Sequence, residues 1–157
     1  MNIERGKKYA LNLLSVRMYT CSEVFDRLLR KGTEKLDAEK IVAELTQKGI
    51  LDDKEYAKCY VHDAAHLSGK GAYRIRQELI KKGIAKKLID EALEESETPF
   101  KDTITEYARL KFGEDIMVSY KELNKIKNHL ARRGFSYGEI SDCLENLRIK
   151  ASRGEEY

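Results

Sequence analysis

A pattern of residues recurs three times along the chain, and this repetition limits the possible folds more than any other feature. Each copy holds a basic residue followed by glycine, at Lys31–Gly32, Lys82–Gly83 and Arg133–Gly134. The glycines recur at an interval of 51 residues (83 − 32 and 134 − 83). A Tyr–Ala pair precedes the glycine of each copy, at residues 9–10, 56–57 and 107–108. A repeat of this length predicts a tandem array of one small structural unit.

Each copy has the pattern of three helices. Apolar residues recur at steps of three and four, which is the period of an α-helix. Thr20, Asp52, Ser119 and Ser136 each precede a glutamate by three residues, the form of a capping box at a helix start. Thr98–Pro99 predicts another start, and glycines 32, 49, 83, 113 and 134 fall where helices should end. The nine predicted helices lie near residues 3–17, 21–31, 38–48, 53–67, 71–82, 85–95, 99–112, 120–133 and 137–149.

We therefore predict an all-α fold of tandem three-helix repeats, about nine helices in an elongated, curved array. The single proline disfavours a β fold, which needs frequent turn signals. The predicted repeats span residues 1–50, 51–97 and 98–150, and the first has three extra residues after its glycine. Residues 151–157 show no pattern and are predicted to be a frayed tail.

Basic residues match between the second and third repeats. The net charge is only +3, so the distribution of charge matters more than its total. In the first repeat the matching positions hold Tyr19, Glu23, Phe25, Arg30 and Lys31, of which only the last two are basic. A shared basic face predicts a surface for a polyanion or for an acidic protein groove; the alternative is a solvated face inherited by duplication. The ten residues of this face are Lys70, Arg74, Arg76, Lys81, Lys82, Lys121, Lys125, Lys127, Arg132 and Arg133.

Three smaller constellations have simpler structural explanations. His62 and His66 have the spacing of two metal ligands on one helix face, but no third ligand follows from the sequence. The pair Asp52–Asp53 resembles a paired-carboxylate site, although a helix cap by Asp52 with Glu55 explains it better. The segment 68–71 resembles a phosphate loop without its Gly–Lys–Ser/Thr ending; a helix-to-helix turn is the expected structure, with amide contact to a DNA phosphate as the alternative. We predict no metal, no cofactor and no catalytic site.

The cysteines and the apolar residues bear on location. Cys21, Cys59 and Cys143 are an odd number at no metal-ligand spacing, which is typical of the reducing cytosol. Cys143 falls on an apolar stripe and is expected in the core, as are the tyrosines of the Tyr–Ala pairs. The first residues have no apolar segment of a signal peptide, and no run reaches the roughly 18 apolar residues of a membrane span. A cytoplasmic protein is the expectation.

The order and spacing of the motifs resemble those of the RecX family of regulatory proteins. The resemblance covers about residues 5–150. In the first repeat it is carried by Ala10–Leu11, Leu14, Arg17, Ser22–Glu23 and Leu28. In the second repeat it is carried by Leu51–Asp53, Glu55–Ala57, Gly69–Gly71, Arg74–Ile75, Glu78–Leu79 and Lys82–Ile84.

The resemblance implies a non-catalytic regulator of DNA repair, recombination and the SOS response. Its implied partner is the RecA filament on single-stranded DNA, and the DNA would be contacted directly or through RecA. Its implied effect is to suppress the strand exchange, ATP hydrolysis and coprotease activity of RecA. In this family the contacts with DNA and RecA are assigned to basic surface. That surface corresponds here to Lys70, Arg74, Arg76, Lys81 and Lys82, and the basic residues of the third repeat are expected to act together with them. A monomer without membrane contact is expected.

Three other functions are compatible with parts of the sequence. A stand-alone DNA-binding regulator would use the same basic helices, although a helix-turn-helix protein reads bases with the helix after its turn, and here the helices after Gly83 and Gly134 carry mixed or acidic charge. A helical scaffold would bind protein alone and would be indifferent to the basic face. An enzyme would need a coherent catalytic site, which the sequence does not offer.

Overall fold

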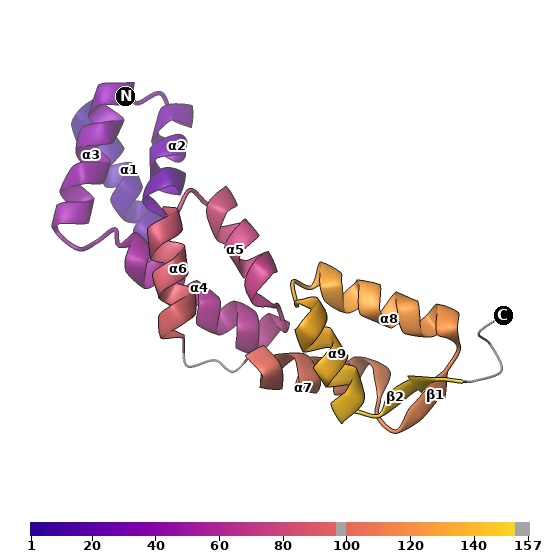
Figure 1. Ribbon diagram of the computed structural model, residues 1–157. Coiled ribbons are helices and arrows are strands. Elements are labelled where there is room, and N and C mark those ends of the chain that lie inside the picture. The colour runs from indigo at the N-terminus through magenta and orange to yellow at the C-terminus, as the bar shows by residue number, and fades with distance from the viewer. Residues whose placement is uncertain (97–99, 153–157) are drawn as a thin grey trace. The chain divides into compact units, whose positions relative to one another are not determined.

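The computed structural model describes residues 1–96 and 100–152, and their regular secondary structure is helical apart from two short strands (Figure 1). The predicted all-α, tandem three-helix fold is confirmed; the curved arrangement of the array stays a prediction. None of the described helices is long and apolar enough to cross a membrane. The elements are α1 (Ile3–Val16), α2 (Cys21–Arg30), α3 (Lys35–Gln47), α4 (Asp53–Ser68), α5 (Ala72–Lys81), α6 (Lys86–Glu95), α7 (Phe100–Phe112), β1 (Ile116–Val118), α8 (Tyr120–Arg132), α9 (Tyr137–Asn146) and β2 (Ile149–Ala151).

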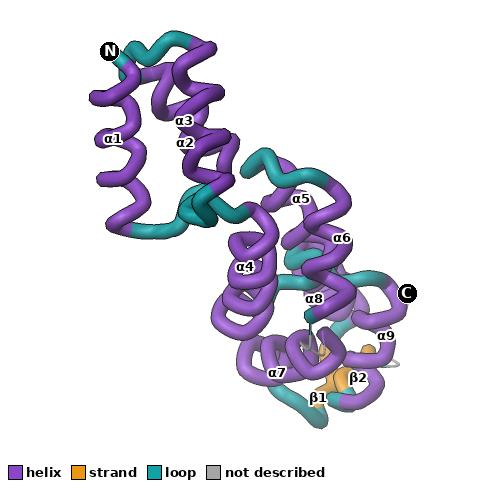
Figure 2. The backbone as a smooth tube through the Cα atoms, turned by 90° about the vertical axis from the view of Figure 1, so that its left-hand side faces the viewer, coloured by secondary structure: helices purple, strands orange, loops and turns teal. Residues whose placement is uncertain are grey.

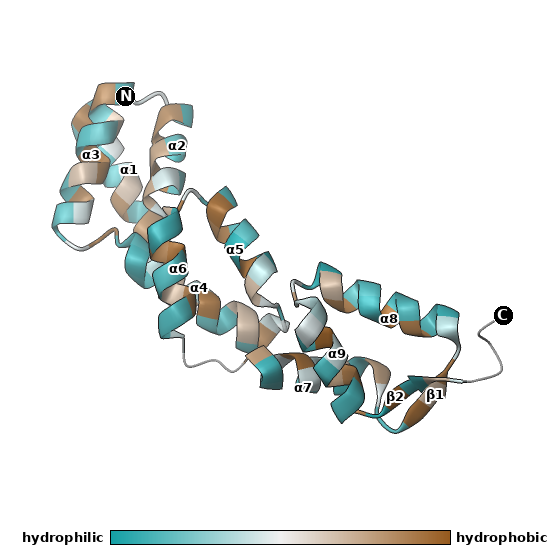
Figure 3. Ribbon diagram, viewed as in Figure 1, coloured by the Kyte–Doolittle hydropathy of each residue, from teal (hydrophilic) through white to brown (hydrophobic). Residues whose placement is uncertain are grey.

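The chain divides into two compact units. Unit 1 comprises Met1–Cys59 and Glu78–Glu95, and unit 2 comprises Tyr60–Gln77 and Ser96–Tyr157. The division falls inside α4 and α5, so each of these helices contributes residues to both units. Alternating hydrophilic and hydrophobic bands run along each helix, as an amphipathic helix requires (Figure 3).

Side-chain caps start several helices as predicted. The Thr20 hydroxyl accepts the Glu23 N–H and the Glu23 carboxylate accepts the Thr20 N–H, a complete capping box; Ser136 forms the same box with its glutamate. The Asp52 carboxylate accepts the Glu55 N–H at 3.1 Å, which confirms its role as a cap. The predicted start at Thr98–Pro99 lies outside the described residues.

Unit 1 has a core in which α1, α2 and α3 meet. Leu28, Ile41 and Leu45 are fully buried there. Tyr19 is only 8% exposed, and the guanidinium of Arg17 lies 3.8 Å from the centre of its ring. Phe25 packs against the same core. The aromatic residues that replace basic ones in the first repeat are therefore packing residues.

Unit 2 has a core made by α7, α8, α9 and the small sheet (Figure 2). Cys143 is buried in it, as predicted. The strands β1 and β2 pair in parallel, with Ile116 opposite Ile149. Sequence analysis did not predict this sheet, because three-residue strands show no periodicity.

The sheet corrects two predictions at the end of the chain. The last helix was expected to reach residue 149, but it ends at Asn146, and Arg148 has a φ of 55°, which an α-helix cannot contain. The chain then enters β2, and the Ser152 N–H donates to the Val118 carbonyl at 2.8 Å. Ala151 and Ser152 are thus held by the sheet where a frayed tail was expected; residues 153–157 lie outside the described part.

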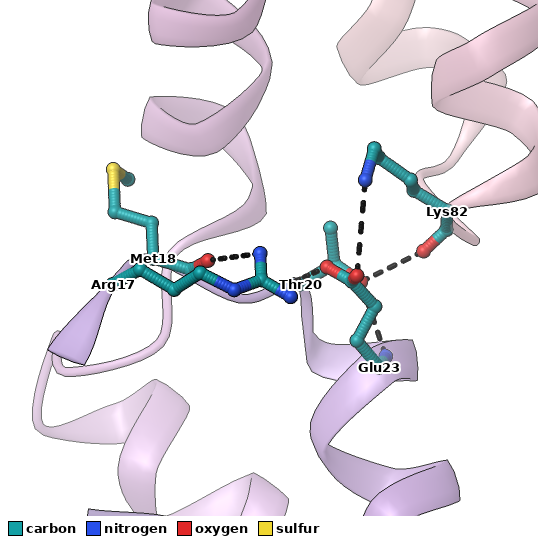
Figure 4. Close-up of polar contacts among 5 residues, drawn as sticks. All are labelled: Arg17, Met18, Thr20, Glu23 and Lys82. Carbon is teal, nitrogen blue, oxygen red and sulfur yellow. Dashed lines mark hydrogen bonds and ion pairs between the residues drawn. The ribbon is translucent and has the colours of Figure 1, made fainter. Parts of the chain in front are cut away.

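The first and second repeats meet at a joint, here called joint 1. The Thr20 hydroxyl at the start of α2 donates to the Lys82 carbonyl at 2.7 Å, and the Lys82 ammonium lies 3.8 Å from the Glu23 carboxylate (Figure 4). Gly83 passes so close to Ser22 that a Cβ there would collide with the serine side chain. The Asp53 carboxylate, at the start of α4, accepts the Cys21 N–H at 2.9 Å. A helix start from one repeat is therefore held by the basic–glycine turn of the next.

The second and third repeats meet in the same way, at joint 2. The Gly71 N–H donates to the Arg133 carbonyl at 2.8 Å, and the Tyr73 N–H donates to the Gly134 carbonyl at 3.2 Å. A Cβ on Gly134 would collide with the backbone of Arg74. Gly71, Arg74, Arg133 and Gly134 are each 51 residues beyond Thr20, Glu23, Lys82 and Gly83 (71 − 20, 74 − 23, 133 − 82 and 134 − 83). The repeated Lys/Arg–Gly pair of the sequence is thus the acceptor half of a repeated joint.

Alanine substitutions separate the joint contacts from backbone strain. Gly49, Gly83 and Gly134 all have positive φ, so alanine at any of them loses about 1–2 kcal/mol of stability. Only at Gly83 and Gly134 would the new Cβ also strike a neighbour, which adds about 1–3 kcal/mol. We expect Gly83→Ala and Gly134→Ala to lower the urea midpoint, followed by circular dichroism, more than Gly49→Ala. Equal shifts in all three variants would mean that the two glycine turns hold no joint.

Candidate nucleic-acid interface

The five predicted residues of the second repeat are divided between the two units. Lys70, Arg74 and Arg76 belong to unit 2, whereas Lys81 and Lys82 belong to unit 1. Lys82 has a structural task in joint 1, where its ammonium lies near Glu23 and 5.9 Å from the centre of the Tyr56 ring. Its alkyl chain and charge therefore contribute to packing inside unit 1.

The residues of the third repeat lie together on α8. Lys121, Lys125 and Arg132 are spaced by four and seven residues, which places them on one face of the helix, opposite the buried Ile126 and Leu130. Within residues 1–96 and 100–152, the ion pairs include none with Lys121, Lys125 or Arg132. A solvated helix face usually alternates its charges, and α8 has one acid, Glu122. The positive charge of this basic face on α8 is therefore not balanced by ion pairs with acidic side chains among the described residues.

Joint 2 brings basic residues of two repeats together. The Arg74 guanidinium donates to the Arg132 carbonyl at 3.5 Å, at the C-terminal end of α8. The same joint position holds Glu23 in the first repeat, so joint 1 pairs opposite charges whereas joint 2 combines Arg74 with Arg133. We call the following eight residues the unit 2 basic surface: Lys70, Arg74, Arg76, Lys121, Lys125, Lys127, Arg132 and Arg133.

Arg133 turns away from solvent toward α7. Its guanidinium lies 4.8 Å from the centre of the Tyr107 ring, and its Nε is buried with no hydrogen-bond partner among the described residues. Tyr107 also places its hydroxyl 2.7 Å from His129 Nε2. Phe112 meets the His129 ring edge-on. Arg133 therefore has a packing role in unit 2, and the solvent-facing charge of the surface rests on the other residues.

The surroundings of His129 disfavour its charged form. Burial lowers the pKa of His129 below its ordinary value of 6.5, and the positive charges of Lys111, Arg132 and Arg133 lower it further. Protonation of His129 would add one more cation beside Tyr107 and two arginines. The neutral imidazole is thus part of the packing that supports the end of α8.

This lowered pKa predicts a stability that depends on pH. As pH falls below 6.5, the unfolded chain takes up the His129 proton before the folded chain does, so stability present above pH 6.5 is lost as pH drops toward the folded pKa. Between pH 7 and pH 5 the wild-type urea midpoint should fall further than that of His129→Gln. Carboxylates titrate equally in both proteins, so the comparison isolates the histidine; parallel curves would contradict the assignment.

Two amide groups of the glycine segment before α5 are bonded within the protein. The Lys70 N–H donates to the Ala64 carbonyl at 3.1 Å, and the Gly71 N–H is used in joint 2. The Lys70 and Gly71 amides are therefore not available to hold a DNA phosphate, because backbone carbonyls already accept from both. The side chain of Lys70 remains part of the unit 2 basic surface.

The other candidate residues have local partners. His62 Nδ1 lies 3.3 Å from the Asp63 carboxylate, and the His62 and His66 ring centres are 4.5 Å apart. The described residues include no group of three or more His, Cys, Asp or Glu placed to hold a metal. Burial raises the pKa of the Cys21 thiol, whose sulfur lies 3.4 Å from the Thr46 hydroxyl.

Two contacts that shape the units were not predicted from the sequence. The prediction gives Asp53 no separate role, yet this carboxylate caps the start of α2. It also does not select His129, which lies between Tyr107 and the end of α8. Asp53 is evident in the sequence as an acidic residue at a predicted helix start, but only the folded joint shows that its carboxylate caps α2. The position of His129 beside a basic run gave no signal of burial.

Comparisons with known proteins agree with these repeats. Residues 7–45 match the first three-helix domain of RecX, and residues 52–93 match its second three-helix domain. The chain is 35% identical over 161 aligned residues to the "Regulatory protein RecX" of Bacillus licheniformis, covering 99% of this chain and 60% of that protein. It is 30% identical to the protein of the same name from Halorhodospira halophila, covering 87% of this chain and 84% of that protein.

A crystal structure shares the fold. The structure of RecX from Lactobacillus salivarius superposes with a TM-score of 0.77 and 30% sequence identity, covering 93% of this chain and 96% of that chain. The chain spans 60% of the length of the Bacillus licheniformis relative, so the two proteins differ in extent.

Proposed function

Because the chain belongs to the RecX family of regulatory proteins, we propose that it binds the RecA filament on single-stranded DNA and lowers the activities of that filament. The affected activities are strand exchange, ATP hydrolysis and coprotease action, which places the protein in recombination, repair and the SOS response. It acts in the cytoplasm as a monomer, by binding, with no bond made or broken.

The uncompensated charge on α8 is the observation that supports this proposal. Lys121, Lys125 and Arg132 share one helix face without acidic partners in the described part of the chain. A RecA filament presents DNA phosphates and protein surface along its groove, and a row of cations gains free energy there by releasing condensed counterions. Three exposed cations without acidic partners do not contribute to the packing of α8, so packing alone does not explain them.

Joint 2 gives the surface its rigidity. Because the start of α5 is hydrogen-bonded to the turn after α8, the cations of two repeats are held in a fixed relation inside unit 2. Fixed charges lose less conformational entropy on binding than charges on independent segments. A rigid basic surface that spans neighbouring subunits of a filament would hinder the changes of their ATPase cycle.

A stand-alone DNA-binding regulator is the second candidate. The same α8 cations favour it, because phosphate contacts alone support DNA binding. The helix after the joint glycine would then have to read bases, yet α9, which begins three residues after Gly134, carries Glu139, Asp142 and Glu145. Acids on that helix repel phosphates, so the RecA filament is the better proposal.

RecA ATP hydrolysis on single-stranded DNA is the test. One variant combines Lys121→Gln, Lys125→Gln and Lys127→Gln; the matched control combines Lys8→Gln, Lys35→Gln and Lys40→Gln, which removes as many charges from unit 1. Wild type and control should suppress hydrolysis alike, and the α8 variant should need about tenfold more protein, equivalent to about 1.4 kcal/mol of lost binding.

The other results separate the alternatives. Equal suppression by both variants would move the contact away from α8. No suppression by the wild type would reject the RecA proposal, and salt-sensitive binding to DNA without RecA would then favour the stand-alone regulator. Circular dichroism must show equal helicity in all three proteins, which the exposed positions of Lys121 and Lys125 favour.

A further inference from the structure

A groove between α8 and α9 of unit 2 is lined by residues other than Lys121, Lys125 and Arg132, the cation row of α8. Its apolar floor is Leu123, Ile140, Leu144 and Ile149. Its polar rim is Asn124, Lys127, Asn128, Ser141 and Tyr137. We call these residues the α8–α9 groove.

In the first repeat the positions equivalent to two rim residues hold apolar side chains that pack on the core. Lys127 corresponds to Phe25 (127 − 25 is twice the repeat interval), and Ser141 corresponds to Val42 once the three extra residues of the first repeat are counted. Phe25 and Val42 pack against the unit 1 core. In the third repeat two apolar residues are thus replaced by polar ones, and a hollow is present. A groove that binds an apolar peptide segment would be expected to have apolar residues at these two positions.

The rim carries the groups that recognise a nucleobase. Tyr137 is 82% exposed at the start of α9, with its ring available for stacking, and a Cβ placed on the next residue, Gly138, would meet nothing within 4 Å. The side-chain amides of Asn124 and Asn128 line the same groove, and an amide offers both a donor and an acceptor. A flat aromatic ring beside amides is the arrangement that binds unstacked bases.

The charge around the groove fits the backbone of the same ligand. Lys127 lies on its rim, and the row of Lys121, Lys125 and Arg132 continues around α8 from it. A base in the groove would have its flanking phosphates next to these cations. Single-stranded DNA has a base to stack on the tyrosine, base edges to bond to the amides and phosphates to pair with the cations. A neutral or acidic protein segment matches these three kinds of group less well.

We propose that the α8–α9 groove binds one unstacked base of single-stranded DNA, with Tyr137 stacking on the base and Lys127 contacting an adjacent phosphate. This inference rests on the proposed function, in which the strand of the filament lies against unit 2. The groove would hold the register of the strand, while the cation row of α8 would hold its phosphates. Asn124 and Asn128 would bond to the edge of the base.

The test compares two labelled oligonucleotides of equal length and charge, without RecA, by fluorescence anisotropy. One is oligothymidylate, and the other has the same backbone without bases. Stacking of one base on an aromatic side chain contributes about 1–3 kcal/mol, so the wild type should bind oligothymidylate at least about fivefold more tightly. Tyr137→Phe should keep this preference, because the ring remains. Tyr137→Leu should remove it while leaving affinity for the abasic strand unchanged.

Lys127→Gln supplies the matched comparison. It should weaken binding of both oligonucleotides by the same factor, because it removes a phosphate contact and leaves the stacking ring in place. Equal wild-type affinity for the two oligonucleotides, or a preference that Tyr137→Leu retains, would overturn the base site. Either result leaves suppression of RecA hydrolysis intact, so the failure of this inference and that of the proposed function are distinguishable.

Discussion

The hydrogen-bonded joint between a helix start and a basic–glycine turn is the constraint on which the rest of the structure depends. In unit 1 the Thr20 hydroxyl bonds to the Lys82 carbonyl, and in unit 2 the Gly71 amide bonds to the Arg133 carbonyl. The Gly71 amide would otherwise be an unsatisfied N–H at a helix N-terminus, whereas at joint 1 the donor is a side-chain hydroxyl. Each glycine leaves room for the helix start that approaches it, so the repeats pack closely at both joints. Three short helices bury little apolar surface alone, and the joint supplies contacts that a single repeat lacks.

The two joints occupy equivalent positions of the repeats but differ in charge, and this difference relates the fold to the function. Joint 1 sets Glu23 against Lys82, so its charges nearly cancel. Joint 2 has Arg74 and Arg133 in the same places, with Arg132 beside them. Duplication thus preserved the packing of the repeat while the side chains at the joint changed. Positive charge could accumulate in unit 2 because two hydrogen bonds of joint 2, from Gly71 N–H to the Arg133 carbonyl and from Tyr73 N–H to the Gly134 carbonyl, join backbone groups.

The periodic features of the fold followed from the sequence, and the local ones did not. The glycine interval predicted the repeats, and the Thr20 and Ser136 boxes predicted helix starts within a residue. The parallel pairing of β1 with β2 and the left-handed turn at Arg148 escaped prediction, because each involves too few residues to leave a pattern. For the site, the sequence predicted the basic positions but not their division: Lys82 and Arg133 pack, whereas Lys121 and Lys125 face solvent. That distinction depends on contacts between residues far apart in the chain.

Hydrogen–deuterium exchange on the protein, alone and bound to RecA filaments on single-stranded DNA, tests the central claim that the unit 2 basic surface contacts the filament. Slow exchange of backbone amides reports which helices a partner protects. The account predicts added protection in α8 and at the start of α5, with α3 of unit 1 unchanged. Protection confined to α1–α3, with α8 exchanging at its free rate, would contradict it.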